Sequence, residues 1–169
     1  GDRSEALRLY LEAARLFDRE DASDELSLVT SRVQALDPAN REVRELAART
    51  LWREGRHDEA RRELSALAAE GSMDAEVHHL LGRLAVEAGD RAGALPHFER
   101  AAALAPDIAA YQLRLAETIH LLGRDPAEAM ERARALAPAD PWLANLEGLR
   151  RLDAGDAASA AERFSAALA

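Results

Sequence analysis

Cysteine and lysine are absent from this chain of 169 residues, and aromatic residues make up only 4% of it. The lack of cysteine excludes disulfide bonds and thiolate metal sites, so the cytoplasm and the periplasm are both compatible locations. Aromatic and β-branched residues, which favour strands, are too few for a sandwich, a barrel or a doubly wound sheet. The chain also lacks an apolar run of about 18 residues, which a membrane span requires, and it shows no targeting segment.

Positive charge is scarce as well. The 31 acidic residues outnumber the 22 basic residues, all of them arginine, and the net charge is −9. Proteins that bind nucleic acid or anionic lipid electrostatically need a positive surface for the phosphates. We therefore expect a protein or peptide partner, with no nucleic acid binding and no membrane insertion.

No catalytic motif is visible. The serines have no Gly-x-Ser-x-Gly setting, and the glycines do not form a phosphate-binding loop. His79, His120 and Glu117 would supply the ligands of a two-histidine-one-carboxylate metal site, but ordinary surface histidines are the stronger interpretation. We expect no enzyme activity, no metal and no cofactor.

What the chain does contain is a repeat rich in alanine, leucine, glutamate and arginine, which are strong helix formers. The motif Ala-Leu-Asp/Ala-Pro occurs at 35–38, 103–106 and 135–138. Four glycines recur at intervals of 34, 34 and 32 residues: Gly55, Gly89, Gly123 and Gly155. We therefore divide the chain into five units: 7–40, 41–74, 75–108, 109–140 and 141–169.

Local signals within the units predict two antiparallel helices joined by a short turn. A glycine after the first helix supplies the left-handed residue that ends it. Asp90 and Asp156 follow as N-caps of second helices, while Asp125 and Asp140 each precede a proline at the first helical position.

Small residues within the helices permit close helix packing, namely Gly82, Ala94, Ala101, Gly148 and Ala160. Pro96 predicts only a local kink. The apolar stripe of the third unit comprises Val77, Leu80, Leu81, Leu84 and Ala85.

The third unit carries a recognisable pattern: Leu81-Gly82, Ala85, Gly89, Ala94, Phe98, Ala101 and Pro106. The fifth unit repeats it with Gly148, Gly155, Ala160, Phe164 and Ala167. This pattern resembles the tetratricopeptide repeat, of the bacterial multi-repeat type, over residues 7–169. The resemblance implies an all-α, right-handed α-α superhelix of about five helix pairs. It also implies a single repeat domain over 1–169, which we expect to be part of a longer protein.

The resemblance implies a function in protein–protein interaction, with the first helices lining a concave groove. Inward positions include Ala110, Leu113 and Asn145, and the candidate partner-binding residues are Arg49, Trp52, Arg53, His79, Arg83, Glu117, His120, Leu121, Trp142, Leu149 and Leu152. Arg49, Arg53 and Arg83 either seat acidic side chains of a partner or pair with Glu45 and Glu87. Trp52 is more typical of packing than of contact, whereas Trp142 fits either role equally. Because lysine is absent, we expect no carboxylate clamp of the kind found in chaperone-binding members.

The last unit departs from the pattern. Glu147, Arg150 and Arg151 stand at expected core positions, and an apolar stripe runs instead through Trp142, Leu146, Leu149 and Leu152. Either this helix is rotated, or its stripe contacts a further repeat or a second copy of the chain.

These observations favour a non-enzymatic scaffold that binds a peptide, a helix or a folded partner in its groove. Two alternatives remain open. One is a self-association module that uses the C-terminal end, and the other is one repeat domain of a bacterial envelope, secretion or motility assembly.

Overall fold

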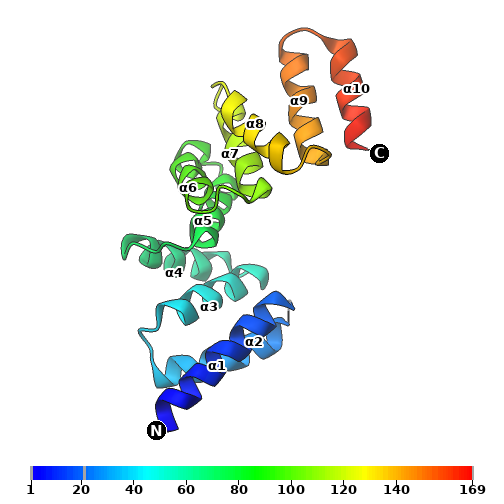
Figure 1. Ribbon diagram of the computed structural model, residues 1–169. Helices are drawn as coiled ribbons and strands as arrows, with labels where there is room; N and C mark the ends of the chain where they lie inside the picture. The colour runs from blue at the N-terminus through cyan, green and yellow to red at the C-terminus, as the bar shows by residue number, and fades with distance from the viewer. Residues whose placement is uncertain (1, 21, 169) are drawn as a thin grey trace. The chain divides into compact units, whose positions relative to one another are not determined.

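The computed structural model describes residues 2–20 and 22–168. Within these ranges it contains ten α-helices and no strand, which confirms the expected all-α class. The helices are α1 (Asp2–Arg19), α2 (Ser23–Leu36), α3 (Arg41–Arg53), α4 (His57–Ala69), α5 (Ala75–Glu87), α6 (Arg91–Leu104), α7 (Ala109–Leu121), α8 (Ala127–Leu136), α9 (Pro141–Asp153) and α10 (Ala157–Ala167) (Figure 1).

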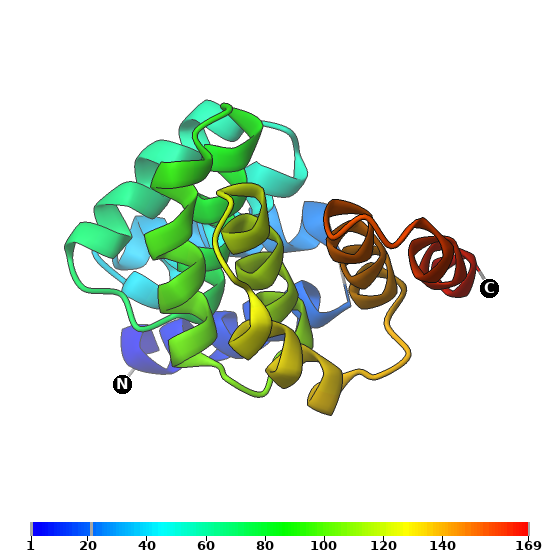
Figure 2. The same cartoon turned by 90° about the horizontal axis from the view of Figure 1, so that it is seen from above.

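The chain divides into two compact units, Gly1–Leu84 and Ala85–Ala169. In the first, α1 packs on α2 and α3 on α4; in the second, α7 packs on α8 and α9 on α10. Figures 1 and 2 show α9 and α10 side by side from two directions. Each of the expected ranges from 41 onwards holds two helices, while α1 begins at Asp2, ahead of the expected start at residue 7. That the repeats form a single domain stays a prediction.

The turns between paired helices depend on glycine, as expected. Gly55, Gly89, Gly123 and Gly155 have positive φ angles of 75°, 82°, 71° and 79°. Residues with a Cβ rarely adopt this conformation, so the glycines end the first helix of each pair. Gly71, after α4, has the same conformation with φ 77°, although the repeat pattern did not single it out.

Aspartates cap the helices that follow these turns. Asp90 accepts a hydrogen bond from Gly93 N at 2.8 Å, and Asp156 accepts one from Ser159 N at 3.1 Å. Asp140 and Asp125 accept from the second residue after them, at 2.8 and 3.1 Å. The expected N-caps Asp90, Asp140 and Asp156 are therefore confirmed, and each satisfies an amide that the helix itself leaves without a partner. For α8 the expectation is wrong, because Pro126 is the N-cap rather than the first helical residue, and Asp125 lies one position before it. Pro96 lies inside α6 without ending it.

In the first unit, apolar side chains of α3, α4 and α5 form the main core. Four residues of the expected stripe are buried, namely Val77, Leu80, Leu81 and Leu84, while its fifth member, Ala85, is only partly buried. These four pack with Ala48, Ala60, Leu64 and Leu67, while a smaller cluster near the N-terminus comprises Ala14, Leu26 and Leu46.

In the second unit, the core runs through α6 to α9. Phe98 is its largest fully buried side chain, and Met130, Leu143 and Leu146 join it. Leu143 is 2% exposed, although the expected stripe of α9 did not include it. Gly148 was expected at a close helix contact, and a Cβ added there would lie 2.6 Å from Cε1 of Phe164.

Candidate partner-binding surfaces

A polar hollow of about 490 Å³ lies between α1 and α3. It is lined by Glu12, Arg15, Asp18, Arg19, Glu42, Glu45, Leu46 and Arg49. Arg15 bonds Glu42 with Nε–Oε1 and Nη2–Oε2 distances of 2.5 and 2.8 Å, so charges of both signs already meet within the hollow.

The expected groove arginines of α3 are held by aspartates. Arg49 Nη1 lies 2.8 Å from Asp18 Oδ2, and its Nη2 bonds Asp74. Arg53 Nη2 lies 2.9 Å from Asp18 Oδ1. Burial has the largest single effect on the pKa of Arg49 and lowers it. The combined attraction of Asp74 and Asp18 is greater, so the pKa of Arg49 is raised. The pairing of Arg49 is thus with Asp18 and Asp74 rather than with Glu45, whose carboxylate accepts from Ser72 Oγ at 2.7 Å.

Trp52 packs within the first unit, as its more typical role predicts. The Arg83 guanidinium lies over its indole, with Cζ 4.1 Å from the ring centroid. The His57 ring stacks on it at 6.3 Å with an interplanar angle of 7°. Trp52 also contacts the core of α3, α4 and α5. Arg83 therefore already has an aromatic partner in the first unit.

His79 was expected to be an ordinary surface histidine, and this expectation is wrong, since both His79 and the adjacent His78 are buried. His78 and His79 are 9% and 8% exposed. His78 Nε2 lies 3.2 Å from the carbonyl oxygen of Ser72. Both rings are buried because α5 is covered on more than the one face that its leucine stripe indicates. His79 thus offers little surface to a partner.

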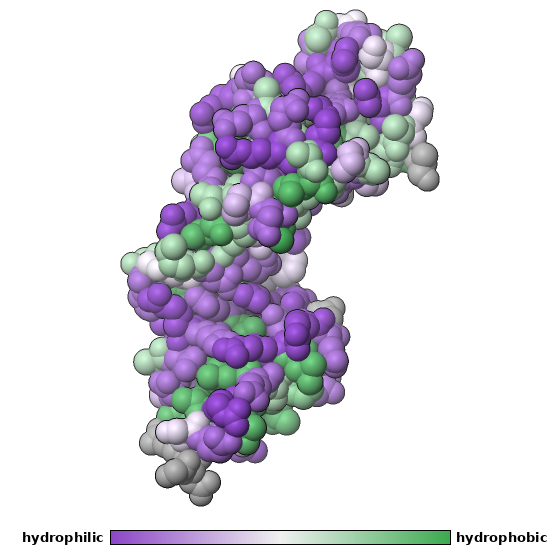
Figure 3. Space-filling model, in the orientation of Figure 1, coloured by the Kyte–Doolittle hydropathy of each residue, from purple (hydrophilic) through white to green (hydrophobic). Residues whose placement is uncertain are grey.

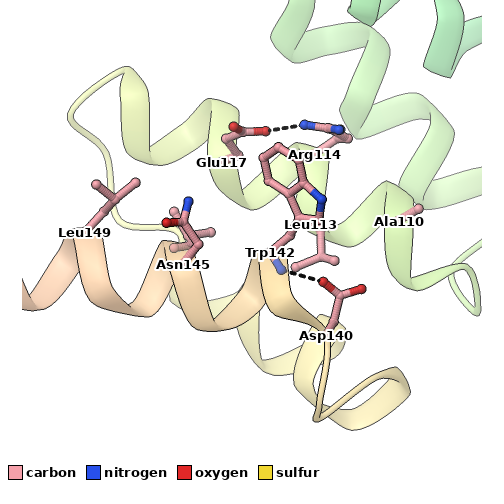
Figure 4. Close-up of a pocket in the computed structure, with 9 residues that line it drawn as sticks. Ala110, Leu113, Arg114, Glu117, Asp140, Trp142, Asn145 and Leu149 are labelled. Carbon is pink, nitrogen blue, oxygen red and sulfur yellow. Dashed lines mark hydrogen bonds and ion pairs between the residues drawn. The ribbon is translucent and has the colours of Figure 1, made fainter. Parts of the chain in front are cut away.

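A second hollow, of about 190 Å³, lies between α7 and α9 (Figure 4). It is lined by Ala110, Leu113, Arg114, Glu117, Asp140, Trp142, Asn145, Leu146 and Leu149. Arg114 donates to Glu117 Oε2 at 2.8 Å. Its Cζ also lies 4.7 Å from the ring centroid of Trp142, which remains 56% exposed.

Several candidate residues meet at this hollow and others do not. It brings together Glu117, Trp142 and Leu149, together with the inward positions Ala110, Leu113 and Asn145. Leu121 and Leu152 are about half exposed but do not line it, and His120 Nε2 lies 3.5 Å from Asp153 Oδ2. Arg114 and Asp140 were missed, although the i,i+3 spacing of Arg114 and Glu117 was a visible signal.

The charged residues of α9 have partners in the second unit. The side chain of Glu147 is 15% exposed, and its Oε1 accepts a hydrogen bond from Arg134 Nη2 at 2.6 Å. Arg163 Nη1 lies 3.3 Å from Glu147 Oε2. Arg150 pairs with Asp125 at 3.2 Å. A third hollow, of about 850 Å³, lies beside these pairs between α8, α9 and α10.

The apolar stripe of α9 is split by this arrangement. Leu146 is buried in the core, Leu149 lines the hollow, and Trp142 and Leu152 are exposed. Within the described residues the stripe is therefore neither wholly buried in the core nor wholly exposed. A contact of this end with another protein surface stays a prediction.

Two further properties bear on function. Among residues 2–20 and 22–168, no group of three histidine, aspartate or glutamate side chains is placed to hold a metal ion. None of the helices in the described part of the chain is long and apolar enough to cross a bilayer.

Comparison with known proteins identifies the repeats. Two family models described as tetratricopeptide repeat match residues 1–84 and 75–108. A "TPR repeat-containing protein" of Treponema pallidum (strain Nichols) is 37% identical over 183 residues, which cover 99% of this chain and 23% of the relative. The chain therefore spans about a quarter of that relative's length.

Solved structures share the fold at low sequence identity. A crystal structure of MamA matches with a TM-score of 0.74 and 21% identity, over 98% of this chain and 91% of that one. YrrB, described as a TPR protein with an unusual peptide-binding site, matches with a TM-score of 0.75 and 14% identity, over 99% and 91%. PilF of Pseudomonas aeruginosa matches with a TM-score of 0.77 and 16% identity, over 99% and 78%.

These likenesses confirm the α-solenoid fold class, and the family models agree with the glycine turns and helix pairs described above. The chain belongs to the tetratricopeptide repeat family.

Proposed function

We propose that the chain is a non-enzymatic scaffold that binds a peptide, a helix or a folded partner on its first helices, with the hollow between α7 and α9 as the main contact. The family as a whole consists generally of protein–protein interaction scaffolds, and both matching family models describe this repeat. The solved structure of YrrB, described as having a peptide-binding site, supports a peptide or an extended segment as the ligand.

The exposure of Trp142 is the observation that carries this proposal. Tryptophan is enriched among the residues that dominate protein–protein binding, and such residues sit beside apolar pockets. Trp142 is 56% exposed and borders a hollow whose apolar wall includes Leu113 and Leu149. An indole that served only to fill the core would be buried. The exposure of Trp142 beside an open apolar hollow therefore favours a binding role.

The charge of the molecule supports a protein partner rather than a nucleic acid. The net charge is −9, and the face drawn in Figure 3 is mostly hydrophilic with separate apolar patches. The three arginines that were candidates to seat acidic side chains already have partners within the chain, since Asp18 bonds Arg49 and Arg53 and the indole of Trp52 contacts Arg83. The first-unit surface is therefore a weaker candidate than the hollow beside Trp142.

A peptide-display library selected on the intact chain tests this function. We expect selected peptides whose binding falls about 30-fold in Leu149→Glu, because a charge in the hollow removes a contact of about 2 kcal/mol. Leu136→Glu is the matched control, since Leu136 is an exposed leucine of α8 that does not line the hollow. Failure to select any peptide, or equal binding by both variants, would refute the proposal.

Self-association through the C-terminal end is a second candidate. Leu152 and Leu168 are 52% and 90% exposed, and Ala158 and Ala161 of α10 are also exposed. An exposed apolar surface of this kind is typical of an interface. The proposal that the chain is one repeat domain of a larger bacterial assembly is supported only by the greater length of the Treponema relative.

A further inference from the structure

We infer that the hollow between α7 and α9 holds one aromatic side chain of a protein partner, next to a basic residue of that partner. The inference rests on the proposed function, because it specifies the ligand that this surface binds. Three properties of the hollow carry it: its size, its free polar group and its charge.

The volume of the hollow matches one ring. An apolar cavity of about 150 Å³ is large enough to bind benzene, and this hollow measures about 190 Å³. A single aromatic side chain therefore fills it, whereas a short aliphatic side chain leaves unfilled space and loses contacts. The exposed indole of Trp142 gives an incoming ring a flat partner for offset stacking or an edge-to-face contact.

The residues that line the hollow favour a ligand with an apolar side chain attached to a peptide main chain. Leu113, Leu146 and Leu149 provide the apolar surface. Asn145 stands among them, and no hydrogen bond or ion pair of its side chain occurs in the described residues. Because an amide that becomes buried needs partners, a ligand that covers Asn145 must offer both a donor and an acceptor. The main chain of a peptide offers both.

Charge determines what flanks the ring. The hollow contains two carboxylates, Glu117 and Asp140, and only one guanidinium, that of Arg114. Arg114 is already engaged by Glu117 and by the indole, while Asp140 uses Oδ1 for the amide of Trp142. The local net charge is therefore negative, as is that of the whole chain. A lysine or arginine beside the aromatic residue is attracted to this rim, and an acidic residue is repelled.

The test uses a 12-residue peptide-display library and synthetic peptides from it, with binding followed by fluorescence anisotropy. We expect the selected peptides to share one aromatic residue next to lysine or arginine. Replacing that aromatic residue by leucine should weaken binding about 5-fold, and replacing it by alanine about 30-fold or more. Changing the basic neighbour to glutamate should weaken binding about 10-fold.

Two variants of the protein locate the site. Ala110→Trp fills the hollow from an exposed position of α7, so it should abolish binding without disturbing the core. Asp140→Asn combined with Glu117→Gln removes both charges but keeps a residue that caps α9 well. Because Arg114 is then the one charged residue that lines the hollow, the preference of the unaltered chain for a basic over a neutral neighbour should disappear or reverse in this double variant.

The indole signal of Trp142 reports occupancy independently. The chain has two tryptophans, so Trp52→Phe leaves a single indole N–H resonance in the NMR spectrum. That resonance should shift on addition of a selected peptide, and it should not shift when the aromatic residue of the peptide is replaced by alanine.

The outcomes separate the inference from the function beneath it. Peptides that bind without an aromatic residue, or that bind Ala110→Trp as well as the unaltered chain, would overturn the inference and leave the scaffold function standing. If no peptide can be selected, the proposed function fails and the inference falls with it.

Discussion

Gly148 shows how one absent side chain positions two helices. It lies on α9, and Cε1 and Cδ1 of Phe164 on α10 would be only 2.6 and 2.7 Å from a Cβ added to it. The close approach lets the ring of Phe164 lie over the backbone of α9. Glycine inside a helix costs about 1 kcal/mol relative to alanine, so its presence here is explained by the space it leaves.

We predict that Gly148→Ala has opposite effects in two backgrounds. With Phe164 present, the added methyl group should lower the free energy of unfolding by about 1–2 kcal/mol through overpacking. In a Phe164→Ala background the same change should raise it by about 0.5–1 kcal/mol, because helix propensity then dominates. Urea denaturation of the four proteins measures both effects. The same sign in both backgrounds would show that the ring does not constrain this site.

At the scale of helices, ion pairs connect elements that are far apart in the sequence. Asp18 near the end of α1 bonds Arg49 and Arg53 of α3, and Arg49 also bonds Asp74 just before α5. Asp18 and Arg49 have side chains that are 13% and 22% exposed. By contrast, the pair Arg8–Glu5 within α1 is 55% and 58% exposed. Of these two examples, the less exposed cluster at Asp18 is the one that joins separate helices.

Asp18→Asn should therefore destabilise the chain more than a surface change of the same kind. We expect a loss of about 1–3 kcal/mol, since charge-assisted hydrogen bonds to two arginines are weakened. Glu5→Gln, the control, should change stability by about 0–1 kcal/mol, because exposed pairs contribute little. Thermal and urea unfolding provide the measurement. Equal effects in the two variants would mean that the cluster at Asp18 is as solvated as the surface pair.

At the scale of the whole molecule, the distribution of exposed apolar residues bears on association. Leu152 and Leu168 belong to the last helix pair and its end, whereas the hollow that we propose as the binding site contains neither of them. Variants can therefore separate self-association from partner binding.

If the C-terminal end associates with a second copy, light scattering should show a mass that rises with protein concentration. Leu152→Glu combined with Leu168→Glu should keep the chain monomeric, because two charges oppose burial of that surface. Leu28→Glu serves as the control, since Leu28 of α2 is 61% exposed and lies in the other unit. A monomer at all concentrations, with or without the changes, would contradict the self-association prediction.

Interactions between near neighbours in the sequence could be predicted with good accuracy. The turns at Gly55, Gly89 and Gly123 and the caps at Asp90 and Asp156 were all expected where they occur. A helix ends because of the conformation of one residue, and a cap bonds an amide two or three residues away. Sequence spacing alone therefore determines these features.

The candidate site could be predicted only in part. Trp142, Leu149 and Glu117 were expected to point inward from the first helices, and they line the hollow. Helical periodicity places Trp142 and Leu149 on the same face of α9, and Glu117 lies opposite on α7. Arg114 and Asp140 were missed as site residues. Arg114 bonds Glu117 one helical turn further along α7, and Asp140 was assigned only a capping role. Which first-helix residues surround an open space depends on how α7 and α9 pack, and periodicity does not specify that.

The sequence by itself determined the family, the helix pairs, the glycine turns and the absence of sites that need cysteine. Only the tertiary structure decided that His78 and His79 are buried and that Leu143 enters the core. It also decided that Arg49 pairs with Asp18, 31 residues away, rather than with Glu45 on its own helix. The physical reason is that burial and ion pairing depend on which distant side chains reach the same place, whereas turns and caps depend on the few residues beside them.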